Sequence, residues 1–229
     1  MEFLDEEELD HSSVVANCRM NRERELTGTN SYTRDLGFDV LAFLSERIRA
    51  GREVTWLDLC CGSARALAQA QRRLETEHGS EAPVRIHGVD LVDRFHPEAT
   101  RSGLSLHVRP IRDFQPTTQF DLVTCVHGLH YVGDKLKAIR LACSWLKPDG
   151  RFRASLDLQN LRLSDGKPAA RSIARALRAQ GLAYDGKRRL LSVDRNLELS
   201  LPFTFVGADD RAGPNSTGQP AVNSYYEAL

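Results

Sequence analysis

From residue 52 onward, short apolar runs alternate with longer stretches of helical character, and this alternation is the strongest constraint on the fold. The strand-like runs read REVTWLDL, VRIHGVDLV, LSLHVRPI, FDLVTCVHG and RFRASLDL. Between them lie ARALAQAQRRLETEHG and DKLKAIRLACSWLKPDG, which are rich in helix-forming residues and end at glycine or proline-containing turns. Strands that alternate with helices predict an α/β fold, in which a parallel sheet carries helices on both faces.

Two further apolar runs, RRLLSVDR and LELSLPFTFVG, are separated by a short polar connection and predict an antiparallel hairpin at the end of the sheet. The expected core, residues 51–207, is therefore a doubly wound, mostly parallel sheet of seven strands. Residues 1–50 look largely helical and are expected to form an N-terminal helical lid. Residues 208–229 are rich in Gly, Pro, Asn and Ser and are expected to be an irregular tail. All three parts are predicted to form one structural domain.

Charge and cysteine usage narrow the class of partner. The 31 Lys and Arg residues equal the 31 Asp and Glu residues, so the chain has no basic surplus of the kind that nucleic-acid or anionic-membrane binders usually show. The apolar runs are too short to span a bilayer, and we expect no secretory leader. The five cysteines are an odd number without the spacing of a disulfide framework, which favours reduced thiols in a cytoplasm.

Acidic residues stand at or just after the ends of three successive predicted strands: Asp58, Asp90 and Asp113. In an open parallel sheet, ligands bind outside the carboxyl ends of the strands. If the ligand is an adenosine, Asp90 can accept hydrogen bonds from both ribose hydroxyls, and Asp113 with Phe114 can bind the adenine. Small residues at 60–64 would let the backbone approach the ligand. The alternative is that these acids are ordinary turn residues, and RDF between PI and QP does make a good turn.

The order and spacing of five segments resemble the class I S-adenosylmethionine-dependent methyltransferases. These segments are WLDLCCGSA, GVDLVD, IRDF, FDLVTCVHGLHYVGD and WLKPDGRF, and the resemblance covers about residues 30–206. It implies a Rossmann-like core that binds S-adenosylmethionine. Dinucleotide dehydrogenases do not share the fourth and fifth segments.

The resemblance implies roles for the residues around the first two strands. Asp58 and the loop 60–64, with Cys60, Gly62 and Ser63, would hold the methionine end of the cofactor. Asp90 would bind the ribose, and Leu91 would pack on the adenine. The family usually has glycines at three alternate loop positions, which are Cys60, Gly62 and Ala64 in this chain. Cysteine and alanine are small enough for the turn to survive.

The resemblance also implies roles further along the chain. Asp113 and Phe114 would contact the adenine, and Cys125 and Val126 would line the cofactor pocket. Tyr32 would reach over the cofactor from the lid, although packing on the core is an equally good interpretation of this tyrosine.

Two histidines after the fourth predicted strand are the candidate catalytic residues. His127 lies where the acceptor should sit, and a neutral imidazole there could take the proton from a hydroxyl as it attacks. Pocket lining or core packing is the alternative for His127. His130 matches the Leu-His dipeptide that is common in the family, where it usually belongs to the cofactor-side wall. A metal site is not expected, because His127 and His130 lack third and fourth ligands nearby.

The predicted function is methyl transfer from S-adenosylmethionine to a small molecule, with release of S-adenosylhomocysteine. O-methylation is the leading form, and N- or C-methylation stays open. Val126 and His127 occupy the place of the polar residue that marks methylation of nucleobase amino groups. Two alternatives are a cofactor-binding protein that transfers no methyl group and a nicotinamide-dependent dehydrogenase. The dehydrogenase should carry an intact G-x-G-x-x-G, which the loop after the first strand lacks. Neither the acceptor nor the oligomeric state follows from the sequence.

Overall fold

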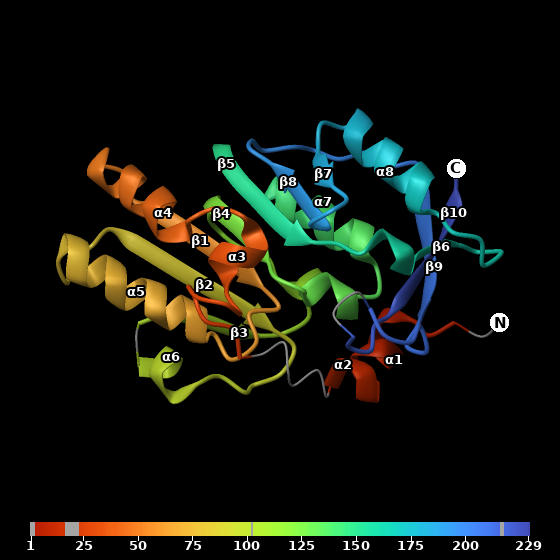
Figure 1. Ribbon diagram of the computed structural model, residues 1–229, viewed down its shortest axis with the longest axis horizontal. Coiled ribbons are helices and arrows are strands. Elements are labelled where there is room, and N and C mark those ends of the chain that lie inside the picture. Colours follow the sequence, from red (N-terminus) through yellow and green to blue (C-terminus); the bar gives the residue numbers. More distant parts are fainter. Residues whose placement is uncertain (1–2, 17–22, 102, 216–217) are drawn as a thin grey trace.

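Seven strands form the central sheet, in the order β3-β2-β1-β4-β5-β8-β7 (Figure 1). The computed structural model describes residues 3–16, 23–101, 103–215 and 218–229. The strands of this sheet are β1 Val54–Leu59, β2 Val84–Asp90, β3 Ser105–Val108, β4 Phe120–Cys125, β5 Leu146–Ser155, β7 Ala183–Asp185 and β8 Leu190–Val193. Strands β1 to β5 are parallel to one another, and β8 is antiparallel to both β5 and β7. The predicted doubly wound, mostly parallel sheet of seven strands is confirmed.

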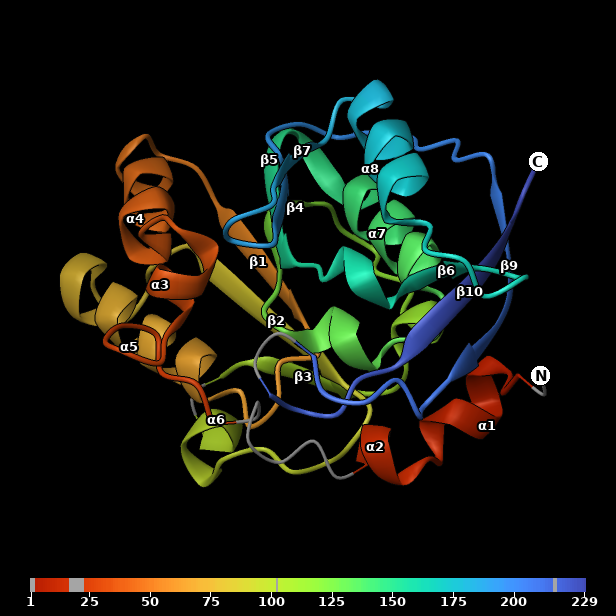
Figure 2. The ribbon, with the colours of Figure 1, turned by 45° about the vertical axis from the view of Figure 1, so that its right-hand side comes forward.

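Helices cover both faces of this sheet, as Figure 2 shows. On one face lie α3 Tyr32–Leu36, α4 Val40–Arg49 and α5 Arg65–His78, and on the other lie α7 Lys135–Ser144 and α8 Ala170–Ala179. The remaining helices are α1 Glu6–Asp10, α2 Ser13–Ala16, α6 Pro97–Arg101 and the short 3-10 turns η2 Ile111–Asp113, η3 Gly128–Tyr131 and η4 Leu158–Asn160.

Strand β1 is buried along its whole length, and its side chains alternate between the two layers. Trp56 packs toward α4 and α5, whereas Leu57 and Leu59 pack toward α7. The indole of Trp56 is fully buried and donates a hydrogen bond of 2.8 Å to Oγ1 of Thr124 on β4. An apolar strand of this kind fits only the centre of a sheet that is covered on both faces.

The hairpin at the end of the sheet differs from the predicted one. It consists of β7 and β8, and β8 lies within the predicted run RRLLSVDR. The second predicted run, LELSLPFTFVG, leaves this sheet and contributes β9 Phe203–Asp209 to a separate sheet of three strands. The prediction paired the two most apolar runs, but the short strand AYD is the actual partner of β8 because it follows α8 directly.

The tail is not irregular throughout, so this part of the prediction is wrong. Residues 223–228 form β10 Asn223–Ala228, which pairs with β9 and with β6 Leu161–Leu163. Strand β10 is therefore held by ladder hydrogen bonds on both of its edges.

A buried lysine ties β10 to the main domain. The Nζ of Lys135, at the first turn of α7, donates to the carbonyl oxygens of Val132 and Val222 at 2.8 and 2.9 Å. It also donates to Oγ of Ser224 at 2.8 Å. Lys135 is only 1% exposed, so each of its three protons has a protein acceptor.

The N-terminal residues divide into two parts. Helix α4 confirms the helix predicted in FDVLAFLSERIRA, and it packs on α5 as part of the core. Helices α1 and α2 lie instead beside β9 and β10, at the side of the molecule where the C-terminus also lies (Figure 1). Residues 17–22, which belong to the predicted lid and include Cys18, lie outside the described residues.

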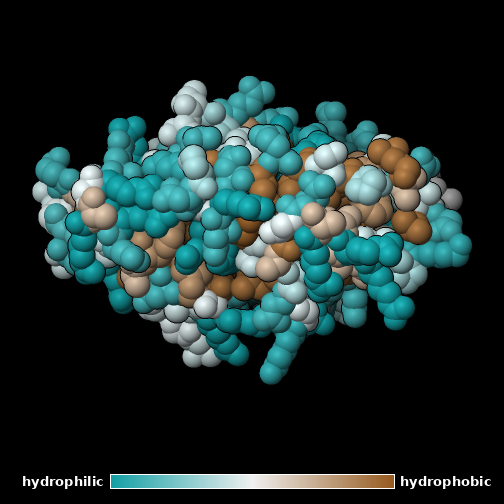
Figure 3. Space-filling model, turned by 90° about the horizontal axis from the view of Figure 1, so that it is seen from above, coloured by the Kyte–Doolittle hydropathy of each residue, from teal (hydrophilic) through white to brown (hydrophobic). Residues whose placement is uncertain are grey.

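Hydrophilic side chains cover most of the face shown in Figure 3, with apolar groups visible between them. Among the described residues, the large apolar side chains classed as exposed are Val108 and Leu229. None of the helices in the described ranges is both long enough and apolar enough to cross a membrane.

Candidate active site

A cavity lies at the carboxyl ends of β1 and β2, beside the point where the strand order reverses between β1 and β4. Its walls include three predicted residues, Cys60, Asp90 and Leu91. The remaining walls come from the segment before and within η2, from the segment that joins η3 to α7, and from α1 and α2. These additional lining residues include Arg109, Pro110, Ile111, Arg112, Tyr131, Lys137, Ala138, Glu6, Asp10 and Val15. We call this space the nucleoside cavity.

The turn between β1 and α5 places alternate residues in the left-handed region. Cys60 has φ 56°, Gly62 has φ 60° and Ala64 has φ 56°. These are the three positions at which the resemblance leads one to expect glycine. A left-handed non-glycine residue costs about 1–2 kcal/mol. The backbone therefore keeps the conformation of a glycine-rich turn although the sequence departs from it.

Cys60 lies against Gly128, where the loop after β4 comes close to the loop after β1. A Cβ atom built on Gly128 would lie 2.3 Å from the Cβ of Cys60 and 2.9 Å from Sγ of Cys125. Real Cβ atoms do not approach so closely, so η3 can start at this point only with glycine at 128. The two cysteines thus bring the loop after β1 and the loop after β4 together. Cys60, Cys61, Cys125 and Cys143 are all free thiols.

Asp90 holds the turn and also faces the nucleoside cavity. Its two carboxylate oxygens accept from the backbone N–H of Gly62 at 2.8 Å and of Val92 at 3.0 Å. A carboxylate that faces the cavity is an acceptor of the kind that ribose hydroxyls require. Leu91 and Ile111 supply apolar surface in the same cavity, which suits an adenine ring. The residues present therefore fit the nucleoside part of S-adenosylmethionine.

Asp58 is fully buried and does not line the nucleoside cavity. Its Oδ2 accepts from the hydroxyl of Tyr32 at 2.6 Å, and its Oδ1 accepts from Oγ1 of Thr124 at 2.5 Å. Burial raises the pKa of Asp58 to about 7, although the two hydroxyl donors act in the opposite direction. Asp58 therefore joins α3, β1 and β4 at the base of the loop 60–64.

The other predicted cofactor residues lie around this junction. Tyr32 is 4% exposed and packs edge-on to Trp56, so in this structure it packs on the core, as the alternative interpretation had it. Val126 is buried in the same apolar cluster as Tyr32. Ser63 is 9% exposed, and its carbonyl accepts from the N–H of His96.

Asp113 and Phe114 lie outside the nucleoside cavity, contrary to the prediction. Phe114 is 5% exposed and packs its ring against Trp145 and His107 in the core. Asp113 ends the turn η2 and borders a shallower hollow on the outside. The turn instead points the preceding residues, Ile111 and Arg112, into the cavity. The sequence signal for this wall was the apolar PI pair that precedes RDF.

His127 ends the β4 segment in a left-handed conformation with φ 58°. Its Nε2 lies 3.4 Å from Oδ2 of Asp35 on α3, and Asp35 also forms an ion pair with Arg24. Its Nδ1 lies 3.4 Å from Nε2 of His130. Asp35 was not singled out from the sequence, because 92 residues separate it from His127 and only the fold brings them together.

His130 is 2% exposed. Burial, followed by the nearby charges of His127, Lys135 and Arg189, lowers the pKa of His130 to about 3, so this ring is neutral at physiological pH. No group of three or more His, Cys, Asp and Glu side chains in the described part of the chain is placed to hold a metal ion.

Comparison with known proteins identifies the family. The family described as "Methyltransferase domain" matches residues 29–195, which is well over half of the chain. No curated protein matches at a significant level.

Many solved structures resemble the chain at low identity. An amino pentose methyltransferase from Micromonospora echinaspora is 23% identical over 56% of this chain and 58% of its own, with a TM-score of 0.37. The N-methyltransferase NodS from Bradyrhizobium japonicum WM9 is 16% identical over 68% of this chain and 84% of its own, with a TM-score of 0.39. Magnesium protoporphyrin IX methyltransferase from Synechocystis PCC 6803 is 13% identical over 80% of this chain and 92% of its own, with a TM-score of 0.44.

The chain spans only about half the length of the first solved structures it matches, at 45%, 58% and 52%. With TM-scores below 0.5, these likenesses add nothing to the family match. The match over residues 29–195, the strand order of the sheet and the fit of the nucleoside cavity agree with one another. The chain belongs to the class I S-adenosylmethionine-dependent methyltransferases.

Proposed function

We propose that this protein methylates a hydroxyl group of a small molecule, with His127 as the residue that takes the proton. The observation that carries the proposal is the contact of 3.4 Å between Nε2 of His127 and Oδ2 of Asp35. A carboxylate that contacts one nitrogen of an imidazole fixes the orientation of the ring, as in other catalytic histidines. The side chain of His127 is 14% exposed, so solvent or an acceptor can reach it.

The position of His127 supports this role. It lies two residues after the end of β4, next to the turn in which Gly128 packs on Cys60 of the predicted methionine-binding loop. When bound, S-adenosylmethionine supplies a methyl group that its sulfonium already activates. The task of the protein residues is then to align the acceptor and to exclude water. A hydroxyl is a weak nucleophile at neutral pH, so loss of its proton to a nearby base assists the attack.

Asp35 contacts Nε2 of His127, so Nδ1 is the nitrogen that takes the proton, once the acceptor hydroxyl displaces the contact of 3.4 Å with His130. Because His130 stays neutral, a proton taken up by His127 remains on that ring. The carboxylate of Asp35 then faces the imidazolium as an ion-pair partner. We assign His130 a positioning role and not the role of base, since a histidine with a pKa of about 3 binds protons too weakly at neutral pH.

A small acceptor is favoured over a nucleic acid because the chain has zero formal net charge. A cytoplasmic location remains part of the proposal and rests on the odd number of cysteines in the sequence.

The test compares His127→Asn and Asp35→Asn with the wild-type protein. Asparagine tolerates the left-handed backbone at 127, so the loop should keep its shape. Labelled S-adenosylmethionine and a small-molecule cell extract would identify the acceptor, and turnover would then be measured with that product. We expect His127→Asn to lower turnover by about 10²–10⁴-fold, the usual contribution of a general base, without a change in the affinity for S-adenosylhomocysteine.

Asp35→Asn should cause a smaller loss, because it leaves the base in place but frees its ring. His11→Asn, which alters an exposed histidine, serves as the control and should match the wild type. Normal turnover of the His127→Asn variant would contradict the role of base, and a labelled amine as product would contradict the hydroxyl acceptor.

A further inference from the structure

Helix α1 forms one wall of the nucleoside cavity, although it lies about fifty residues before the first strand of the core. Glu6 and Asp10, one turn apart on α1, both line the cavity together with Asp90 and Leu91. Val15 of α2, which belongs to the same apolar cluster as Leu9 of α1, also lines the cavity. A ligand in the cavity would therefore touch both the sheet and α1.

The helix is too short to be stable alone, since isolated helices of five residues do not form in water. Its N-terminus is capped by Asp5, which accepts from the backbone N–H groups of Glu7 and Glu8. Leu9 is 1% exposed and packs in a cluster with Tyr131 and Val222. Helix α1 thus owes its structure to its docking on η3 and on the C-terminal segment.

The chain just before α1 is paired with the C-terminal sheet. Leu4 and Ala208 of β9 exchange two backbone hydrogen bonds of 2.9 Å each. Strand β9 pairs with β10, and Lys135 fastens β10 to α7. Residues near both ends of the sequence therefore form the surface on which α1 docks, next to the cavity.

Two ion pairs join α1 to residues that line the nucleoside cavity. Asp10 contacts Arg112 on η2 at 2.6 Å, and Glu6 contacts Lys137 on α7 at 3.4 Å. All four side chains are 20–35% exposed, so these pairs are open to solvent and to screening by salt. Arg112 and Lys137 line the cavity as well, so both partners of each pair belong to its lining.

We propose that α1 closes the nucleoside cavity over the cofactor and that the Glu6–Lys137 and Asp10–Arg112 pairs limit how fast the cofactor leaves. A short docked helix with few buried apolar residues opens at a low free-energy cost, whereas the strands of the core do not. Release of the nucleoside then follows undocking of α1. This inference depends on cofactor binding alone, and it holds whichever acceptor is methylated.

The test measures the dissociation rate of S-adenosylhomocysteine by stopped-flow, with no acceptor present. The double variant Glu6→Gln, Asp10→Asn removes both ion pairs but keeps the side-chain shapes. We expect its release to be about fivefold to thirtyfold faster than that of the wild type, as two exposed or half-exposed pairs allow. Raising the salt concentration should speed release from the wild type and have little effect on the double variant.

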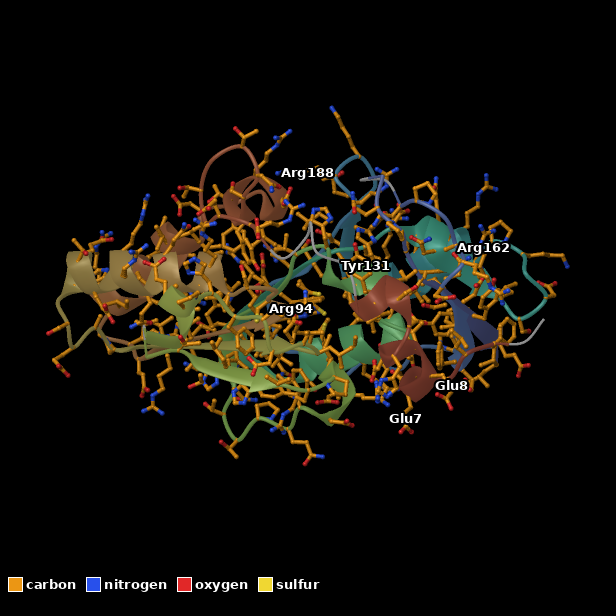
Figure 4. All side chains as sticks on the ribbon, turned by 90° about the horizontal axis from the view of Figure 1, so that it is seen from below. Glu7, Glu8, Arg94, Tyr131, Arg162 and Arg188 are labelled. Carbon is orange, nitrogen blue, oxygen red and sulfur yellow. The ribbon has the colours of Figure 1, made fainter. Side chains whose placement is uncertain are left out.

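Glu7→Gln is the control for Glu6→Gln, because it makes the same substitution on the same helix without removing an ion pair to Arg112 or Lys137. Glu7 is exposed, and Figure 4 shows it at the outer edge of the molecule. Its release rate and salt dependence should equal those of the wild type. The exchanged pair Glu6→Lys with Lys137→Glu should restore slow release relative to Glu6→Gln alone. Equal release rates in the double variant and in Glu7→Gln, with equal unfolding temperatures, would overturn the proposal.

Discussion

Replacement of Lys135 by methionine tests whether the C-terminal strand is part of the fold. The Nζ of Lys135 donates to Val132 O, Val222 O and Ser224 Oγ, all within 2.9 Å. Methionine has a similar length and no donor, so Lys135→Met leaves the packing almost unchanged but leaves three buried acceptors without their partner.

The expected cost follows from these contacts. A buried acceptor that loses its hydrogen bond costs about 1–3 kcal/mol, and Lys135→Met leaves three such acceptors, while removal of the buried charge offsets part of this cost. We therefore expect Lys135→Met to lower the free energy of unfolding by about 3–5 kcal/mol. In a protein of this size each kcal/mol shifts the melting temperature by about 2–4 °C, which gives a decrease of about 10 °C.

The assay is thermal and urea unfolding followed by circular dichroism at about pH 6. Burial lowers the pKa of Lys135 to about 7, so the amine is still protonated at that pH and all three donors are present. Lys137→Met is the control two residues further along the same helix. Lys137 is 35% exposed at its side chain and has one ion pair, so this change should cost less than about 1 kcal/mol. Equal unfolding temperatures of the two variants would refute the stabilising role of the Lys135 hydrogen bonds.

Three further changes test the site. Ala64→Gly should stabilise the protein by about 0.5–1 kcal/mol in urea unfolding, because relief of the left-handed strain at φ 56° exceeds the entropy cost of glycine; a loss of stability would contradict the strain. Burial raises the pKa of Asp58 from 3.8 to about 7, so between these pH values the folded protein keeps a proton that the unfolded chain has lost. The stability that protonated Asp58 provides is present at low pH and is lost as the pH rises from about 4 to 7. The free energy of unfolding then falls by at most about 1.4 kcal/mol per pH unit. Urea unfolding across this range should show that slope in the wild type and a smaller one in Asp58→Asn, and identical slopes would argue against it. Asp90→Ala should weaken binding of S-adenosylhomocysteine by at least about tenfold in calorimetry, since the ribose hydroxyls lose a charged acceptor; unchanged affinity would exclude that role.

The sheet and the turn after β1 could be predicted because their signals are local. The apolar run around Trp56, the helix formers before Gly79 and the small residues 60–64 each determine the conformation of a few neighbouring residues. The place of Asp90 beside the cavity could be predicted for the same reason, since a residue at the end of a parallel strand lies at the carboxyl edge of the sheet whatever the rest of the chain does.

Side-chain direction beyond a strand end was harder to predict. Asp58 and Asp113 looked alike in the sequence, as acids after apolar runs. In the structure Asp58 turns into the protein toward Tyr32 and Thr124, and Asp113 turns outward at the end of η2. A turn of three residues decides this direction, and its geometry depends on what packs beneath it.

The sequence by itself determined the α/β class, the parallel core strands and the left-handed turn after β1, because periodicity and turn chemistry act over a few residues. Only the tertiary structure decided which strand pairs with β8, that residues 223–228 form β10, and that α1 covers the nucleoside cavity. The contacts responsible join residues far apart in the sequence, such as Asp35 with His127 and Asp10 with Arg112. No local pattern encodes such a pair, since its two members meet only after the sheet and its helices have packed together.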